Sequence, residues 1–179
     1  MKSWRLIIFA LVACAQLAVP GSLIWKREQT LGRGSVWKFR TAPVDPVDVF
    51  RGRYVALHFD AETQEISPPT NTESGDAVFV TLKRNAEGFA EINQVSTAKP
   101  GGDDFIAAQL NGNRISLPFD KYWVTERDAP AAEVAYQNLS RRGNQNAFVS
   151  VRVFRGDAAI EQLYLDNLPL GDYLRANAK

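Results

Sequence analysis

A chain of 179 residues that is 45% hydrophobic and 23% charged is long enough for one well-packed domain and short for two. Its formal net charge is +1, and without Lys2 and Arg5 of the N-terminal leader, residues 26–179 carry a net charge of −1. Nothing in this balance indicates a nucleic-acid surface, and we expect no nucleic-acid partner.

Residues 4–25 form an apolar segment with no acid and a single base. As a helix rising about 1.5 Å per residue, this segment would just cross the hydrocarbon core of a bilayer. Tryptophans at both ends suit the membrane interface, and the leader bases favour a cytoplasmic N-terminus. We therefore predict a single-pass signal anchor at residues 1–25 and one domain at residues 26–179. In the polar connector 26–35, Gly32-Arg33-Gly34 is expected to break any helix.

Two alternatives for the apolar segment stay open. Ala13, Ala15 and Ala18 could supply the small-x-small site of a cleaved signal peptide, although the apolar run continues to Trp25. Leu-Val-Ala-Cys ending at Cys14 has the form of a lipoprotein signal, although an apolar stretch follows it. Cys14 is the only cysteine, so no intrachain disulfide can form.

The rest of the chain predicts a mainly β, antiparallel domain of about seven or eight strands with one packed helix. A strand is expected at residues 36–40, and the prolines at 43 and 46 then force an exposed, extended lead-in. In residues 53–59, Val55, Leu57 and Phe59 alternate with Tyr54, Ala56 and His58. Because both faces are fairly apolar, this strand is predicted to lie buried between layers.

The remaining elements follow from turn and capping residues. A long polar loop is predicted at residues 61–76, and a helix is predicted to begin near Asp128, with Pro130 in its first turn, and to run to Arg142. Three hairpins are expected, pairing residues 77–83 with 89–97, 105–110 with 114–117 across Asn-Gly, and 148–154 with 158–165 across Arg-Gly-Asp.

Catalytic sites are mostly excluded by counting. One histidine and one cysteine cannot build a Cys-His pair or a Cys/His zinc centre, and Gly-Arg-Gly-Ser lacks the ending of a phosphate loop. We expect no catalytic residue, no metal site and no cofactor. The alternative is a membrane-tethered hydrolase of signal-peptidase-like type, in which Ser35 would be the nucleophile and Lys83 its base. Ser35 lacks the Ser-x-x-Pro setting typical of those proteases.

The stretch Lys-Tyr-Trp-Val-Thr-Glu at residues 121–126 combines aromatic and charged side chains just before the predicted helix. These side chains could line a groove. The alternative is an aromatic strand that packs beneath the helix.

Two stretches, TAPVDPVDVFRGRYVALHF at residues 41–59 and LPFDKYWVTERDAPAAEVAYQ at residues 117–137, resemble the GDYXXLXY family of bacterial membrane-anchored proteins. The family is named after the motif Gly-Asp-Tyr-x-x-Leu-x-Tyr. Gly52, Tyr54 and Leu57 match this motif, whereas Arg53 stands in place of the aspartate and Phe59 in place of the last tyrosine. The literal Gly-Asp-Tyr-Leu at residues 171–174 is a decoy, because nothing after it fits.

This resemblance implies an inner-membrane protein with a periplasmic β-rich domain and no assigned activity. Because members are often encoded beside multi-spanning membrane proteins, it also implies a partner of that kind. The candidate binding surface comprises Arg51, Arg53, Tyr54, Lys121, Tyr122 and Glu126. The positions expected to serve the motif or the fold are Pro43, Asp45, Pro46, Gly52, Leu57 and Phe59.

Overall fold

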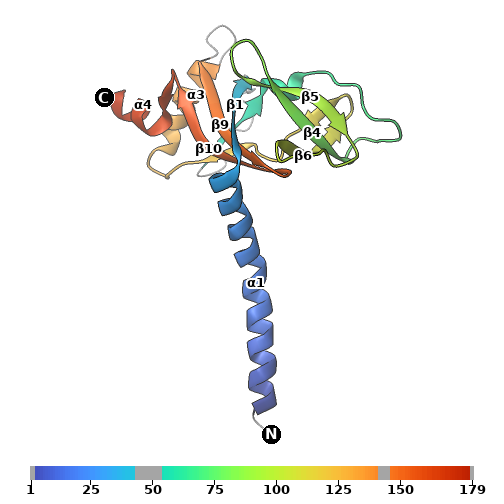
Figure 1. Cartoon of the computed structure of the whole chain (residues 1–179). Coiled ribbons are helices and arrows are strands. Elements are labelled where there is room, and N and C mark those ends of the chain that lie inside the picture. Colours follow the sequence, from blue (N-terminus) through green and yellow to red (C-terminus); the bar gives the residue numbers. More distant parts are fainter. Residues whose placement is uncertain (1–2, 43–53, 141–145, 178–179) are drawn as a thin grey trace.

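The computed structural model describes residues 3–42, 54–140 and 146–177, and it consists of a long N-terminal helix that leads into a β-rich domain (Figure 1). Helix α1 (Ser3–Arg33) projects from the domain as a single rod. The apolar stretch within Ile7–Arg33 is long and apolar enough to cross a membrane, and none of it is buried in the domain.

Most of the polar connector predicted at residues 26–35 is helical, because α1 continues through it, but the helix ends at Arg33, within the Gly32-Arg33-Gly34 sequence that was predicted to break it. The helix ends at Gly34, whose N–H donates to the carbonyl of Thr30 at 2.9 Å, and strand β1 begins at the next residue. Thr30 is only 2% exposed, so the last turn of α1 is already part of the domain. A Cβ atom at Gly34 would lie 2.4 Å from the Thr30 carbonyl oxygen and 3.0 Å from that of Val153. Glycine is therefore required where the helix ends against the sheet.

The strands form three sheets whose ladders are all antiparallel. The five-stranded sheet has the order β11 (Leu168–Pro169), β10 (Asp157–Leu165), β9 (Ala147–Phe154), β1 (Ser35–Ala42) and β3 (His58–Phe59). The four-stranded sheet has the order β5 (Ala90–Ser96), β4 (Ala77–Arg84), β6 (Phe105–Asn111) and β7 (Arg114–Ser116). A two-stranded ribbon pairs β2 (Tyr54–Ala56) with β8 (Lys121–Trp123).

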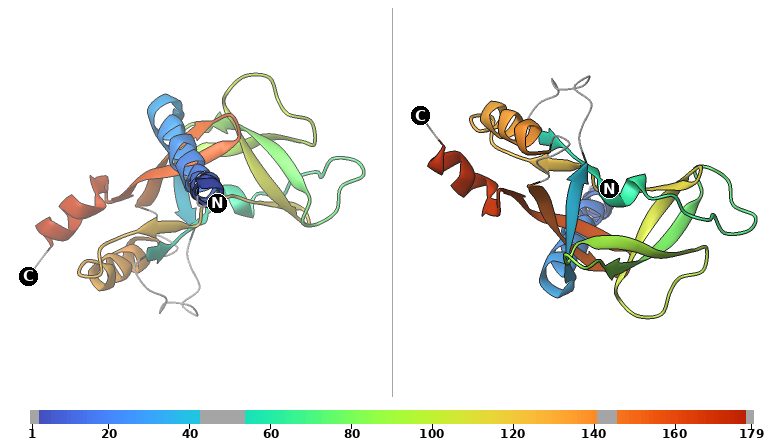
Figure 2. Two further views of the ribbon diagram at one scale, coloured as in Figure 1. Left: turned by 90° about the horizontal axis from the view of Figure 1, so that it is seen from below. Right: turned by 90° about the horizontal axis from the view of Figure 1, so that it is seen from above.

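Three short helices complete the described chain: α2 (Asp60–Thr63), α3 (Ala129–Ser140) and α4 (Leu170–Ala176). The views from below and above show α3 and α4 at one end of the domain and the four-stranded sheet at the other (Figure 2). The mainly β, antiparallel class and the long apolar N-terminal helix are confirmed.

The described residues contain eleven strands and four helices, more elements than the sequence predicted. Helix α3 begins where expected, while its expected end at Arg142 lies outside the described residues. The loop predicted at residues 61–76 begins later than expected, because its first three residues belong to α2, which ends at Thr63. The missed elements α2, α4 and β11 have two to seven residues each, which is too short for a clear hydrophobic period. Strand β8 lies within residues 121–126, where an aromatic strand was one of the two alternatives.

The strand predicted at residues 53–59 is divided between two sheets. Its first part, β2, joins the ribbon, and its second part, β3, forms an edge of the five-stranded sheet. Between them, the Leu57 N–H donates to the Asp120 carbonyl at 2.8 Å. Val55, Leu57 and Phe59 point into the core as predicted, but Ala56 and His58 are exposed. The expected burial between two layers is therefore wrong, because one face of this segment meets solvent.

Three phenylalanines gather where the motif segment meets β1. Phe39, Phe59 and Phe119 pack edge to face, with ring centroids 5.2 to 5.8 Å apart. They belong to one hydrophobic core that includes residues of both large sheets. Edge-to-face pairs of this kind stabilise a core beyond the area that they bury. The predicted structural positions Leu57 and Phe59 are thus both core residues.

The Arg-Gly-Asp sequence forms the predicted hairpin turn and also joins the two large sheets. Gly156 has φ +100° and accepts a hydrogen bond from the Ala107 N–H at 2.9 Å, while its own N–H donates to the Phe105 carbonyl at 2.9 Å. A Cβ atom at this position would lie 3.1 Å from the Phe105 ring. The backbone conformation and this close contact explain the glycine.

Candidate binding surface

The β2–β8 ribbon brings together two of the stretches that the sequence singled out. Tyr54 pairs with Trp123, Val55 with Tyr122, and Ala56 with Lys121. Because side chains alternate along a strand, Tyr54, Ala56, Lys121 and Trp123 share one face, which we call the ribbon face. Val55 and Tyr122 lie on the opposite face.

The ribbon face carries an aromatic pair and a cation. The Tyr54 and Trp123 rings pack edge to face with their centroids 5.3 Å apart, and the Lys121 Nζ lies 5.5 Å from the Tyr54 ring centroid. Trp123 is 65% exposed, and Lys121 forms an ion pair with Asp120 at 3.5 Å. A large apolar side chain is therefore held in a defined position without being covered.

The inner face of the ribbon is fixed to the five-stranded sheet. Tyr122 is half-buried against the core, and it is hydrogen-bonded to the Leu163 backbone and the Gln162 side chain of β10. Burial raises the pKa of Tyr122 above its usual value, and the two hydrogen bonds offset part of that rise. Tyr122 therefore holds the inner face of the ribbon against β10, while Tyr54, Lys121 and Trp123 face outward.

Trp123 lines two surface grooves. One, which we call the α1 groove, has a volume of about 400 Å³ and is lined by Arg27 of α1, by β8 and by Ile160 and Glu161 of β10. The other, the α4 groove, has a volume of about 380 Å³ and is lined by Trp123, the segment that follows it, and Leu170 and Leu174 of α4. Both are open hollows on the surface of the domain.

The remaining candidate residues are distributed as follows. Glu126 is exposed in the segment between β8 and α3. Pro43, Asp45, Pro46, Arg51, Gly52 and Arg53 lie outside the described residues. Sequence reasoning placed Trp123 in the right stretch but left it out of the candidate set. Its position two residues after Lys121 was the signal that both side chains share a face.

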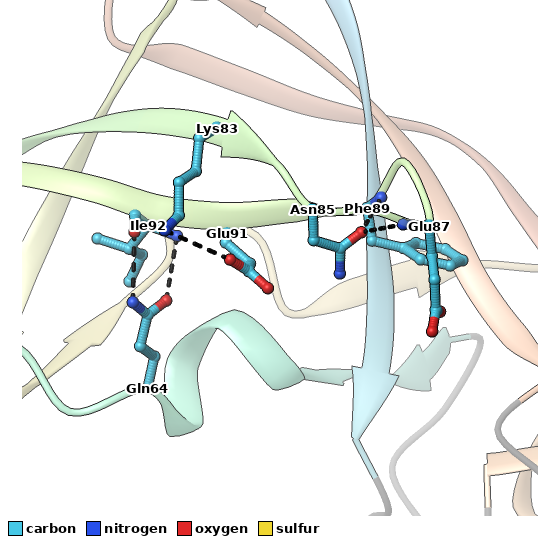
Figure 3. Close-up of polar contacts among 7 residues, drawn as sticks. All are labelled: Gln64, Lys83, Asn85, Glu87, Phe89, Glu91 and Ile92. Carbon is cyan, nitrogen blue, oxygen red and sulfur yellow. Dashed lines mark hydrogen bonds and ion pairs between the residues drawn. The ribbon is translucent and has the colours of Figure 1, made fainter.

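The two residues of the alternative hydrolase, Ser35 and Lys83, have other surroundings. Ser35 lies at the junction of α1 and β1, opposite Val153. Lys83 is 53% exposed and forms an ion pair with Glu91 at 3.6 Å (Figure 3). In the part of the chain that the structure describes, no hydrogen bond joins Ser35 to Lys83. An exposed, ion-paired ammonium lacks the desolvated setting that turns a lysine into a base for a nucleophile.

Polar side chains near Lys83 serve the fold. The Gln64 amide pairs with the backbone of Ile92 through two hydrogen bonds of 3.2 and 3.3 Å, and the Asn85 Oδ1 accepts from the N–H groups of Glu87 and Phe89 (Figure 3). Among the described residues, no group of three or more His, Cys, Asp or Glu side chains is placed to hold a metal ion.

Two carboxyl groups on α2 have raised pKa values. The Glu62 carboxylate accepts hydrogen bonds from the Leu117 N–H at 2.9 Å and from the Phe59 N–H at 3.3 Å. Burial nevertheless raises the pKa of Glu62, and it also raises that of Asp60, where the positive charge of Arg40 opposes the shift. Glu62 thus links the motif segment to the end of β7 and has a structural role.

Comparison with known proteins identifies the family. A family model described as GDYXXLXY protein matches residues 16–163, which include both the motif segment and the β8 stretch. The match ends before the literal Gly-Asp-Tyr-Leu at residues 171–174, which supports its interpretation as a decoy. No curated protein and no solved structure matches the chain. The match covers most of the sequence, and the chain therefore belongs to the GDYXXLXY family.

Proposed function

We propose that this protein is a single-pass inner-membrane protein whose β-rich domain lies in the periplasm and binds another membrane or envelope protein through the ribbon face. Trp123 carries the proposal, because its indole is 65% exposed yet held against Tyr54 beside Lys121. Tryptophan and tyrosine are enriched among the residues that dominate binding energy at protein interfaces. A rigid, uncovered aromatic pair of this kind suits a binding surface better than a packing role.

The continuity of α1 supports a retained anchor. Cleavage after Ala18 would remove the N-terminal half of a helix whose C-terminal turn is built into the domain at Thr30. It would also leave Leu23, Ile24 and Trp25 exposed on the released domain, each more than 60% accessible. A helix that stays in the membrane covers these apolar side chains with lipid.

The anchor and the topology can be tested directly. The intact mass of the protein isolated from membranes should correspond to the full chain, and alkaline extraction should leave it in the membrane fraction. A reporter enzyme that works only in the periplasm should be active when it is fused after Lys179. A mass that lacks the first 18 residues, or activity of a cytoplasmic reporter at the same position, would contradict this part of the proposal.

The position of the ribbon face favours a partner at the membrane. The α1 groove is lined by both Arg27 and Trp123, so the ribbon lies beside the point where α1 leaves the domain. In the view from below, the segment around residue 120 is seen between α1 and α3 (Figure 2, left). A multi-spanning membrane protein can reach this face without approaching the distal end of the domain.

Site-specific photocrosslinking in intact membranes tests partner binding. A benzophenone amino acid placed at Trp123 should yield one prominent crosslinked membrane protein, and Tyr54→Ala in the same chain should weaken that product. The matched control carries the crosslinker at Val134, an apolar residue of α3 that is 59% exposed. Absence of a product at position 123, or the same product at position 134, would refute the assignment of the ribbon face.

A further inference from the structure

We infer that the α1 groove binds the phosphate of an anionic phospholipid at the membrane surface, through Arg27 and Lys121. This inference rests on the anchoring half of the proposed function and is independent of the protein partner. The groove shares Lys121 and Trp123 with the ribbon face, whereas Arg27 belongs to the groove alone, and the task inferred for it is to set how the domain lies on the bilayer.

The groove lies at the height of the lipid headgroups. If Trp25 marks the edge of the hydrocarbon core, Arg27 stands about 3 Å beyond that edge and Thr30 about 7.5 Å beyond it, at a rise of 1.5 Å per residue. The headgroup layer on each side of a bilayer is roughly 5–8 Å thick. Thr30 is already buried in the domain, so the base of the domain meets the headgroups directly. The hollow beside Arg27 then opens within that layer.

The junction at Gly34 makes this position rigid. Helix α1 passes into β1 through one residue, and the Arg152 guanidinium donates to the Gly34 carbonyl at 3.2 Å. With no flexible connector between helix and sheet, the groove keeps one orientation relative to the helix axis. The membrane can therefore meet the same surface of the domain each time.

The charges of the groove leave one cation without a carboxylate. Glu161 is engaged by Arg152 through two hydrogen bonds of 3.0 and 3.1 Å, and Lys121 pairs with Asp120 at 3.5 Å. Among the described residues, Arg27 has no hydrogen bond or ion pair. The planar guanidinium binds a phosphate through two parallel N–H groups, and a lysine ammonium adds a point charge beside it.

Trp123 completes the lipid-facing side of the groove. Indole rings favour the headgroup region because they combine a large apolar surface with one N–H donor. Trp123 lines the same hollow as Arg27 and Lys121 and is largely exposed. The groove thus presents to a single headgroup the Arg27 guanidinium, the Lys121 ammonium that pairs with Asp120, and an interfacial aromatic side chain.

Lipid titration of the full chain tests the two cations. Delipidated protein in a neutral detergent is titrated with phosphatidylglycerol, and bound lipid is counted by native mass spectrometry. Arg27→Gln and Lys121→Gln should each lower the affinity about fivefold, the effect expected for one basic residue near an anionic surface. Phosphatidylcholine should bind more weakly than phosphatidylglycerol to the parent chain.

The matched control is Arg33→Gln, which removes the same charge from the same helix. Arg33 is six residues beyond Arg27, about two-thirds of a turn around the helix, and it does not line the groove. This variant should retain the parent affinity. Equal losses for Arg27→Gln and Arg33→Gln would show diffuse attraction only and would overturn the inference, as would an unchanged affinity of Arg27→Gln.

A second measurement locates the domain on the bilayer. In nanodiscs of equal parts phosphatidylcholine and phosphatidylglycerol with gadolinium-bearing headgroups, the amide signals of Lys121 and Trp123 should broaden strongly. Those of residues 85–88 should not, because Glu87 pairs with Arg40 at the end of β1 away from α1. Equal broadening of both sets would overturn the proposed placement.

The two proposals fail separately. Arg27→Gln should lose lipid affinity and keep the crosslink at position 123. If the crosslink is absent while lipid binding behaves as expected, only the protein partner is refuted. A chain whose mass shows that α1 has been removed would refute the anchor and the lipid site together.

Discussion

The substitution Gly34→Ala tests the rigid junction between helix and sheet. The added Cβ would lie 2.4 Å from the Thr30 carbonyl oxygen, whereas ordinary contacts of a Cβ begin near 3.4 Å, so the gap must open by about 1 Å. The obstacle is backbone on both sides, since the Val153 N and O lie 3.1 and 3.0 Å away. No side-chain rotation can relieve this overlap.

The expected loss of stability follows from two contributions. Opening the gap breaks the Gly34–Thr30 hydrogen bond, which contributes about 1 kcal/mol. Forcing a methyl group into a packed site adds about 1–3 kcal/mol. The free energy of unfolding should therefore fall by about 2–4 kcal/mol, and Tm by roughly 5–15 °C for a chain of this size.

Thermal unfolding of the full chain in mild detergent, followed by near-ultraviolet circular dichroism, measures this loss. Gly32→Ala is the control, because a Cβ at Gly32 meets nothing within 4 Å and the residue is exposed near the end of α1. It should leave Tm unchanged or raise it slightly, since alanine favours the helix by up to about 1 kcal/mol. A Gly34→Ala protein as stable as the parent would refute the rigid junction, and so would an equal loss in both variants.

Three further predictions concern the domain itself. Because burial raises the pKa of Glu62 above 4.5, the value of an unperturbed glutamate, the folded state holds this proton to higher pH than the unfolded chain does. The free energy of unfolding should therefore fall as the pH rises from 4.5 through the folded-state pKa. When urea unfolding is measured at several pH values in this range, Glu62→Gln should reduce the dependence of the unfolding free energy on pH and leave the contributions of Asp60 and Glu133, whose pKa values burial also raises. An unaltered pH dependence would contradict the assignment. Phe59→Ala empties a fully buried site, so the free energy of unfolding measured by calorimetry should fall by about 3–5 kcal/mol. A fall below about 1 kcal/mol would mean that the core collapses around the gap. Trp123→Ala should lower the free energy of unfolding by no more than about 1.5 kcal/mol, the contribution of its edge-to-face contact with Tyr54. The same variant should no longer co-purify with the partner. A larger loss of stability in urea unfolding would indicate a structural role for Trp123.

The candidate surface could be predicted only in part. Tyr54 and Lys121 were both named from the sequence, and β2 lies inside the predicted strand, but the pairing of two three-residue strands so far apart in the chain has no local signal. Tyr122 has the same composition signal as its neighbours, and only its contact with β10 turns it inward. The exposure of Trp123 likewise depends on how the other elements pack around the ribbon, and the local sequence does not predict this.

The apolar helix, the antiparallel β class, the start of α3 and the turns at Asn111-Gly112 and Arg155-Gly156 were all predicted correctly, because they depend on local backbone preferences and on the period of burial. The tertiary structure set how the end of α1 packs against the sheet, where the motif segment is divided, and which residues meet on the ribbon face. Those outcomes depend on contacts between distant segments. The 2.9 Å hydrogen bond at Gly34 is local, but whether the helix ends against β9 there depends on Val153, which lies far along the chain.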